Sequence, residues 1–364
     1  MKKTSLLTSL FLSLLLCSCH PDDPVPQSDY DFGEGVFVLN EGTYTYANSS
    51  LSFYDVQKDS VMNNVFYRVN GAPIGDVGQS LAMINGKLYI VVNNSNYIYK
   101  VDANTLVCDT TKAYLLGDFY SPRYMLPLAP DKAYISDLAG RNLWIINPEN
   151  MTHTGSIAMG KPTETMVMVG KEVFVTNWSK YYDTTLDNNT VMVVDAERDI
   201  KVSEIVVGKE PNGMVVDRDG KVWVLCEGAF WAMELGLEDS EDPEYPTLWK
   251  IDPLTKKATC EITFDTTATC LAIDPQGAYM YCFVNGDVRR ISVSTSSIDD
   301  TFCIPSEGRI FYKMSVNPYN GDLYLTDAKN YSVNGEAFRY SADGVLLSSF
   351  KVGICPGFML FKKD

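Results

Sequence analysis

Aromatic rings and neutral amides recur in the predicted loops of this chain and at the starts of its apolar segments. The candidate binding residues are these rings and amides together with two arginines: Tyr44, Tyr46, Asn93, Asn94, Asn96, Arg123, Tyr124, Arg141, Trp178, Tyr181, Phe230, Trp231, Tyr312 and Tyr331. Aromatic faces supply apolar contact area, and amides supply paired donors and acceptors without a charge to desolvate. Such a set suits a large, uncharged ligand that carries amides of its own.

Other chemistry is poorly supported. The chain has 2 histidines, His20 and His153, which argues against a histidine triad, a multi-histidine metal site and histidine ligation of haem. No Gly-rich phosphate loop and no GxSxG motif occur. We therefore assign no catalytic residue and no metal ligand. An acidic loop remains open as a solvated surface, a hydrolytic carboxylate pair or a calcium site: Glu238, Asp239, Glu241, Asp242 and Glu244. The formal net charge of −16 argues against a nucleic-acid partner.

Seven repeats position these residues. Each begins with an apolar, β-rich segment that contains a central aromatic residue: Phe37, Tyr89, Tyr134, Phe174, Trp223, Tyr281 and Tyr324. A second strand follows each and ends at a short polar residue: Asp55, Asp102, Asn147, Asp195, Asp252, Ser292 and Ser341. The unit therefore repeats roughly every 48 residues, which is typical of propeller blades.

The strand pattern predicts an all-β, seven-bladed β-propeller without an amphipathic helix. The first unit lacks an inner strand, and the C-terminal PGFMLF has the inner-strand pattern without an aromatic partner. We expect these two ends to pair and close the ring. The long connections 177–189 and 227–246 should lie on the same face as the starts of the inner strands, which we call the top face. The predicted inner strands supply Met83, Met125, Met166, Met214 and Met314, with Asp274 as one of few acids.

The N-terminal residues predict export and lipidation. Lys2 and Lys3 precede an apolar run from Leu6 to Leu16, and Leu16-Cys17-Ser18-Cys19 resembles a bacterial lipobox. An ordinary secretory signal is the alternative. We expect a signal peptide over 1–18, a lipidated Cys19 with a flexible tether over 19–31, and the propeller over 32–364. Seven cysteines remain, an odd number that argues against a fully paired disulfide framework.

Several stretches resemble BtuG-type surface lipoproteins of Bacteroidetes, which are YncE-like seven-bladed propellers. They are GVFVLNEG at 35–42, NSSLSFYD at 48–55, the segment 70–102, SPRYMLP at 121–127, DGKVWVLCEG at 219–228 and the C-terminal NGEAFRYSADG and SFKVGICPGFMLF. The resemblance implies a lipid-anchored protein on the surface of the outer membrane that is not an enzyme. It also implies that the protein captures vitamin B12 and related cobamides as transported ligands and passes them to a BtuB-like TonB-dependent transporter.

The resemblance assigns the ligand to the top face and to no individual contact. Other interpretations remain open: a surface lipoprotein for another nutrient such as a glycan or haem compound, a propeller hydrolase or lactonase, and a protein-interaction scaffold.

Overall fold

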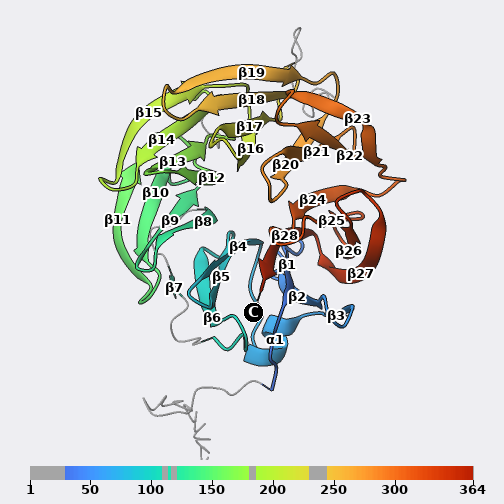
Figure 1. Ribbon diagram of the computed structural model, residues 1–364. Coiled ribbons are helices and arrows are strands. Elements are labelled where there is room, and N and C mark those ends of the chain that lie inside the picture. Colours follow the sequence, from blue (N-terminus) through green and yellow to red (C-terminus); the bar gives the residue numbers. More distant parts are fainter. Residues whose placement is uncertain (1–28, 109–113, 116–120, 180–185, 229–243, 364) are drawn as a thin grey trace, which may run out of the picture.

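A computed structural model describes residues 29–108, 114–115, 121–179, 186–228 and 244–363. Within these ranges, seven four-stranded antiparallel sheets surround a central channel (Figure 1). The predicted seven-bladed β-propeller is confirmed. Blades 1 to 7 are numbered along the chain, and each is given from its inner to its outer strand.

The strands of blades 1 to 4 have the following bounds. Blade 1 consists of β28 (Pro356–Lys362), β1 (Gly35–Asn40), β2 (Ser50–Asp55) and β3 (Ser60–Met62). Blade 2 consists of β4 (Gly78–Ile84), β5 (Lys87–Val92), β6 (Tyr97–Asp102) and β7 (Tyr114–Leu115). Blade 3 consists of β8 (Pro122–Ala129), β9 (Lys132–Asp137), β10 (Asn142–Asn147) and β11 (Thr152–Ala158). Blade 4 consists of β12 (Met166–Val169), β13 (Glu172–Thr176), β14 (Thr190–Asp195) and β15 (Ile200–Val206).

The remaining blades follow the same order. Blade 5 consists of β16 (Pro211–Val216), β17 (Val222–Cys226), β18 (Thr247–Asp252) and β19 (Lys257–Thr263). Blade 6 consists of β20 (Ala268–Ile273), β21 (Tyr279–Val284), β22 (Asp287–Ser292) and β23 (Ser297–Ile304). Blade 7 consists of β24 (Phe311–Val316), β25 (Leu323–Asp327), β26 (Asn334–Tyr340) and β27 (Leu346–Ile354).

The ring closes in blade 1, as the two chain ends predict. The C-terminal strand β28 pairs antiparallel with β1, so that Phe37 lies opposite Leu360 and Leu39 opposite Phe358. This pairing gives the first blade its inner strand and removes the free edge that either end would otherwise expose.

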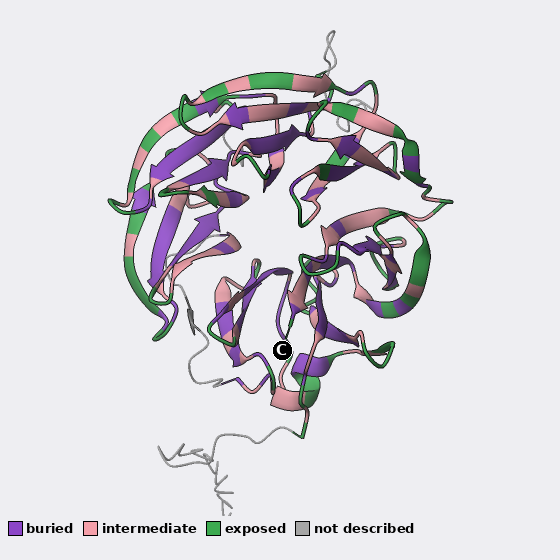
Figure 2. Cartoon of the chain, in the orientation of Figure 1, coloured by how far each residue is buried: buried purple, intermediate pink, exposed green. Residues whose placement is uncertain are grey.

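The aromatic residue of each second strand lies in the core. All seven are at most 2% exposed: Phe37, Tyr89, Tyr134, Phe174, Trp223, Tyr281 and Tyr324. The apolar clusters lie between blades: Tyr89 of blade 2, for example, belongs to the same cluster as Met125 and Trp144 of blade 3. Burying such a side chain contributes on the order of 1.5–3 kcal/mol. Figure 2 shows the resulting pattern, with buried middle strands and alternating exposure on outer strands such as β11, β15 and β19.

The polar residues that end the third strand of each blade, counted from the channel, fold the next turn. Asp102 Oδ1 accepts the backbone N–H groups of Asn104 and Thr105, and Asp252 Oδ1 accepts those of Leu254 and Thr255. A short carboxylate side chain bonds its own turn in this way because the acceptor reaches N–H groups two and three residues ahead. These recurring acids are therefore explained by the fold.

One short helix departs from the prediction. α1 (Val65–Asn70) connects blades 1 and 2, and it buries Val65 and Phe66 in the first core cluster. Gly71 ends it with a left-handed backbone (φ 66) and donates its N–H to Tyr67 O at 2.8 Å. Six residues make fewer than two turns, which is too short for an amphipathic repeat to show in the sequence.

The inner strands carry β-bulges where they start at the top face. Six of the seven described inner strands shift register there, all except β12. The residues at the shifts are Gln79, Arg123 and Tyr124, Asn212, Cys270 and Leu271, Tyr312, and Gly357. A bulge turns a side chain away from the regular alternation of a strand, and here these residues line the channel.

Candidate binding site at the mouth of the central channel

A cavity of about 630 Å³ opens on the top face where blades 1, 2, 3 and 7 meet. We call it the mouth cavity. Its lining comes from the loops after β1, β5 and β25, the bulged starts of β4, β8 and β24, and the residue before β28: Glu41, Gly42, Thr43, Tyr44, Val77, Gln79, Asn93, Arg123, Tyr312, Lys313, Tyr331, Ser332 and Cys355. The hollow is therefore built from segments that are far apart in the sequence.

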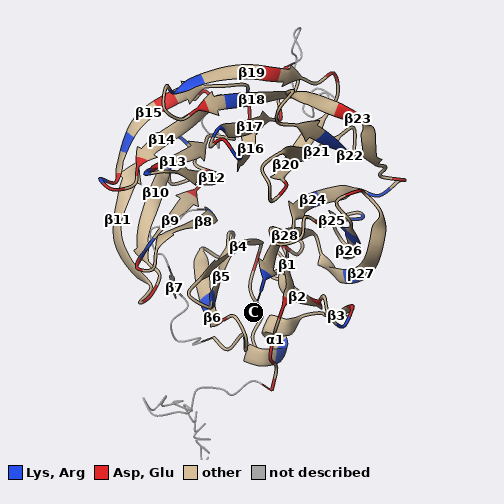
Figure 3. Cartoon of the chain, viewed as in Figure 1, with Lys and Arg blue, Asp and Glu red and all other residues tan. Residues whose placement is uncertain are grey.

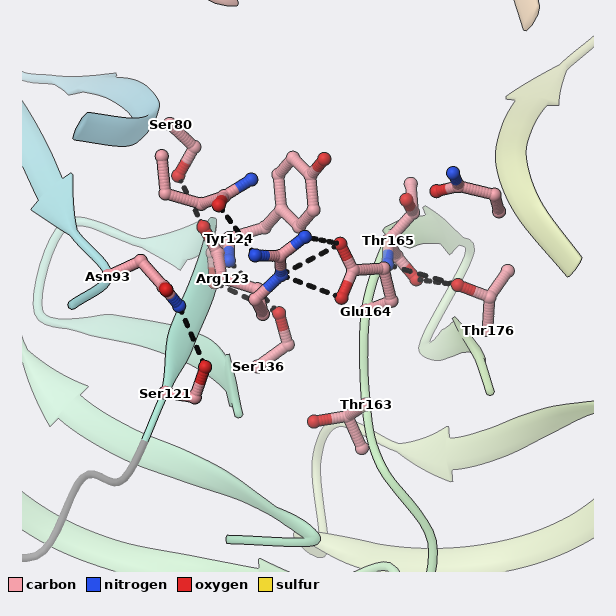
Figure 4. A network of polar contacts seen from close by, with 12 residues as sticks. Ser80, Asn93, Ser121, Arg123, Tyr124, Ser136, Thr163, Glu164, Thr165 and Thr176 are labelled. Atoms are coloured by element: carbon pink, nitrogen blue, oxygen red, sulfur yellow. Dashed lines mark hydrogen bonds and ion pairs between the residues drawn. The ribbon is translucent and has the colours of Figure 1, made fainter. Parts of the chain in front are cut away.

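Arg123 ties three blades together on one side of the mouth cavity. Its guanidinium donates from Nε to both carboxylate oxygens of Glu164, at 2.9 and 2.8 Å, and from Nη2 to Oε1 at 2.7 Å (Figure 4). Nη1 donates to Gln79 Oε1 at 2.6 Å. The Arg123 side chain is 17% exposed and that of Glu164 only 2%. Burial opposes the charge of Arg123, but Glu164 raises its pKa above the usual value. Arg123 and Glu164 form a buried, bidentate ion pair.

The amide of Asn93 is also used within the fold. Asn93 Nδ2 donates to Ser121 Oγ at 2.8 Å and to the carbonyl oxygen of Pro122 at 2.9 Å, which links blade 2 to the start of β8 (Figure 4). Arg123 and Asn93 therefore shape the wall of the mouth cavity, and a ligand would meet them as residues already held in place.

Glu41 lies on the other side of the mouth cavity. The Tyr312 hydroxyl contacts both of its carboxylate oxygens at 3.0 Å. Burial raises the pKa of Glu41, although Lys313, Tyr312 and Arg123 act in the opposite direction. A Cβ on Gly357 would lie 2.0 Å from Glu41 Oε1, so only glycine leaves room for this carboxylate beside β28. The bulge of β28 thus creates the space that Glu41 occupies.

A smaller cavity of about 160 Å³ lies in the channel. Lys313 lines both this cavity and the mouth cavity. We call the smaller one the inner cavity. Asn212 Nδ2 donates to Glu227 Oε1 at 3.0 Å in its wall. Burial raises the pKa of Glu227 to about 7, against the lowering effect of Lys313 and Asn212. Burial also works against the charge of Lys313, but Tyr124 and Cys270, followed by Glu41 and Glu227, raise its pKa above the usual value. Lys313 therefore carries a positive charge deep in the molecule.

Exposed aromatic rings stand at the rim of the mouth cavity. Tyr44 is 67% exposed, Tyr46 71% and Tyr331 45%. The loop that carries Tyr44 and Tyr46 is held by Asp76, whose carboxylate accepts the Thr45 N–H at 2.9 Å. Tyr331 meets the ring of Tyr312 edge-on, with centroids 5.7 Å apart. The rim thus presents rings that the rest of the fold leaves uncovered.

The structure gathers some of the residues that the sequence suggested and separates others. Tyr44, Asn93, Arg123, Tyr312 and Tyr331 line the mouth cavity, and Tyr124 lines the inner cavity. The indole N–H of Trp178 is buried without an acceptor among the described residues, close enough to Glu227 to lower its pKa.

The other suggested residues lie elsewhere. Tyr46, Asn94, Asn96 and Arg141 do not line either cavity. Asn94 instead donates to Asp76 at 2.5 Å. The suggested residues Tyr181, Phe230 and Trp231 lie outside the described residues, as do Cys19 and most of the acidic loop.

The sequence analysis named Arg123 but missed four other charged residues of the channel: Glu41, Glu164, Glu227 and Lys313. The acid it expected on an inner strand, Asp274, folds a turn instead, where its Oδ1 accepts the N–H groups of Ala278 and Tyr279 at 2.6 and 2.7 Å. The inner-strand methionines Met125, Met166, Met214 and Met314 pack in the clusters between blades. One signal was present: the Asn-Glu-Gly at 40–42 and the Cys-Glu-Gly at 226–228 place a glutamate at the same point of blades 1 and 5.

The described residues show neither the pattern of a metal cluster nor that of a membrane-spanning helix. They contain no group of three or more His, Cys, Asp or Glu side chains placed to hold a metal ion. None of their helices is long and apolar enough to cross a membrane. All seven cysteines from Cys108 onward have free thiols. Figure 3 shows charged residues along outer strands such as β15, β19 and β23.

Comparison with known families identifies the chain. A family model described as a domain of unknown function, DUF5074, matches residues 34–343. The chain belongs to the DUF5074 family. No curated protein sequence matches this DUF5074 protein.

Solved structures share the fold of this DUF5074 propeller. A quinonprotein alcohol dehydrogenase-like protein from Bacteroides thetaiotaomicron has a TM-score of 0.69 and 17% identity, covering 92% of this chain and 79% of its own. A protein from Lactobacillus plantarum has a TM-score of 0.62 and 15% identity, covering 91% of this chain and 99% of its own. A virginiamycin B lyase from Staphylococcus aureus has a TM-score of 0.55 and 10% identity, covering 75% of this chain and 83% of its own. At these identities the likeness concerns the fold alone.

Proposed function

We propose that this propeller is a surface lipoprotein that binds cobamides at its top face and passes them to a TonB-dependent outer-membrane transporter. The observation that carries the proposal is the mouth cavity, a hollow of about 630 Å³ bordered by the exposed rings of Tyr44 and Tyr331. Aromatic rings around a hollow are the usual anchors of a large ligand because they lose little conformational freedom on binding.

The charges beneath the rim are compatible with an uncharged ligand. Glu164 holds Arg123, and Tyr312 holds Glu41. Among the charged groups that line the mouth cavity, Arg123 is therefore paired and Glu41 is hydrogen-bonded, and Lys313 is left to meet an acceptor oxygen of the ligand. A cobamide has a broad apolar macrocycle with peripheral amides, and it is too large to be enclosed by this cavity. It would cover the opening, with the rings of Tyr44 and Tyr331 against the macrocycle.

The resemblance of GVFVLNEG and of the C-terminal GICPGFMLF to BtuG-type proteins supports the same proposal, and the structure gives both segments a place at the mouth cavity. Glu41 and Gly42 of the first segment line it, as does Cys355 of the second. Gly357 of the second segment leaves the space for Glu41. The lipid anchor at Cys19 and the transporter belong to the proposal as well.

Titration calorimetry of the chain lacking residues 1–28 with cyanocobalamin tests the proposal. We expect saturable binding at micromolar protein, and we expect Tyr44→Ala and Tyr331→Ala each to weaken it about tenfold, since truncating an aromatic anchor costs on the order of 1–2 kcal/mol. Tyr319→Ala is the matched control, because this tyrosine is 52% exposed but lies in the turn between β24 and β25 on the opposite face. No heat with several cobamides would rule the proposal out.

A further inference from the structure

The inner cavity has the dimensions of a side pocket. At about 160 Å³ it has room for a single small group, and its lining includes Lys313, which also lines the mouth cavity. Its walls come from the inner strands of blades 1, 3, 5, 6 and 7, with Thr165 from blade 4. A ligand that covers the mouth could extend one arm past Lys313 into this space.

Lys313 and Glu227 both line the inner cavity without forming an ion pair with each other. No carboxylate among the described residues lies within 4.0 Å of the Lys313 ammonium. Across the cavity, the Glu227 carboxylate is held by the Asn212 amide at 3.0 Å. A buried ammonium and a buried carboxylate normally pair directly, because each is costly to keep out of water alone. Here the two side chains share the lining of a cavity of about 160 Å³ and form no direct ion pair.

Lys313 and Glu227 together determine which chemical group can bind in the inner cavity. A carboxylate would face Lys313 favourably but would be repelled by Glu227 and by Glu41. An ammonium would be attracted to Glu227 and repelled by Lys313. A primary carboxamide has an acceptor oxygen at one side and two N–H donors at the other, and it carries no net charge. It satisfies both ends, and the Tyr124 hydroxyl, which donates to no described residue, can supply a further donor.

We infer that the inner cavity is a subsite for one primary carboxamide arm of a ligand, with the amide oxygen toward Lys313 Nζ and the amide NH₂ toward Glu227. Lys313 and Glu227 are the specificity-determining residues. The subsite itself follows from these residues, and only the identity of the molecule that carries the arm rests on the proposed function.

Small probes test the subsite without a cobamide. Saturation-transfer NMR of the chain lacking residues 1–28 should show binding of propionamide and at least threefold less transfer to propionate at the same concentration. Lys313→Met should lower the propionamide signal at least fivefold, and Glu227→Gln, which keeps the shape of the side chain, at least threefold. Lys351→Met on the exposed edge of β27 is the matched control and should leave the signal unchanged. Unchanged circular dichroism would show that the variants are folded.

Equal signals from propionamide and propionate, or a propionamide signal that survives in both Lys313→Met and Glu227→Gln, would overturn the inference. Cyanocobalamin, whose macrocycle bears primary amides, then separates the two proposals. Binding of cyanocobalamin with no propionamide signal would refute the subsite and leave the proposed function standing. A propionamide signal without cyanocobalamin binding would refute the proposed function and leave the subsite. If both ligands bind, Lys313→Met should weaken the binding of cyanocobalamin about tenfold. An unchanged affinity for cyanocobalamin would show that the amides of cyanocobalamin do not use the inner cavity.

Discussion

The ion pair between Arg123 and Glu164 makes a quantitative prediction about stability. Glu164 is 2% exposed and accepts three N–H contacts from a guanidinium that is itself 17% exposed. Removing one partner leaves the other charge in a site with little water. We expect Glu164→Ala and Arg123→Met to destabilise the propeller far more than the loss of a surface ion pair would.

The structure sets the size of each effect. Breaking a buried ion pair from one side costs on the order of 3–5 kcal/mol. Glu164→Ala should fall near the lower end, about 3 kcal/mol, because Arg123 keeps its bond to Gln79 and opens onto the mouth cavity. Arg123→Met should cost about 5 kcal/mol, since the carboxylate of Glu164 is more deeply buried and loses all three contacts. The double variant leaves neither charge, so its loss should be at least about 2 kcal/mol smaller than the sum of the two single losses.

Urea unfolding followed by tryptophan fluorescence at pH 7 measures these differences. Glu197→Ala is the control, because Glu197 pairs with Lys171 at 2.6 Å while their side chains are 60% and 73% exposed, and such pairs contribute at most about 1 kcal/mol. Single losses below about 1 kcal/mol, or a double variant whose loss equals the sum, would refute the claim that this pair is buried and coupled.

Three further changes probe the channel and the anchor. Burial raises the pKa of Glu227 from 4.5 to about 7, so the folded state favours the protonated side chain. As the pH rises from 4.5 through 7, the wild type should therefore lose up to about 3 kcal/mol of stability relative to Glu227→Gln. Urea unfolding measures this difference, and a difference that stays constant with pH would contradict the prediction. Gly357→Ala should lower the stability measured by urea unfolding by about 1–3 kcal/mol, because the new Cβ would meet Glu41. The control Gly155→Ala should cost little, since the atom nearest to its Cβ lies at 3.6 Å. If the additional change Glu41→Ala does not reduce the loss caused by Gly357→Ala, the clash with Glu41 is not its cause. Cys19→Ala should move the protein from the membrane to the soluble fraction, and unchanged fractionation would contradict the lipid anchor.

The scaffold could be predicted because its signals are local and repeated. An aromatic residue such as Phe174 or Trp223 occupies the same position in each unit, and a turn signal precedes most of them. Ring closure could be predicted as well, because the two ends of the chain lack complementary strands. The helix α1 could not, since six residues carry no periodic pattern. Its formation depends on the place that the first core cluster offers to Val65 and Phe66.

The predicted top-face residues fell into two groups for a physical reason. Residues at bulges, such as Arg123 and Tyr312, line the mouth cavity, so their position at the start of an inner strand predicted their place. Loop residues such as Asn94 and Asn96 belong to a tight hairpin, and Asn94 bonds the neighbouring loop through Asp76. Residue type alone cannot distinguish an amide that binds a ligand from one that folds its own turn.

The acidic residues of the channel escaped prediction because each is contacted by a residue at a bulge: Glu41 by Tyr312, Glu164 by Arg123 and Glu227 by Asn212. Glu41 and Glu227 occupy the same position, directly after the second strand of blades 1 and 5, yet their environments differ. Glu41 is contacted by Tyr312 from the bulge of blade 7, whereas Glu227 is contacted by Asn212 from the bulge of its own blade. A bulge adds one residue to a strand and leaves little trace in a two-residue repeat. It nevertheless decides whether a glutamate faces a phenol or an amide, and so which of the two cavities it lines. The chemistry of this channel therefore depends on a feature of the backbone that the hydrophobic pattern does not encode.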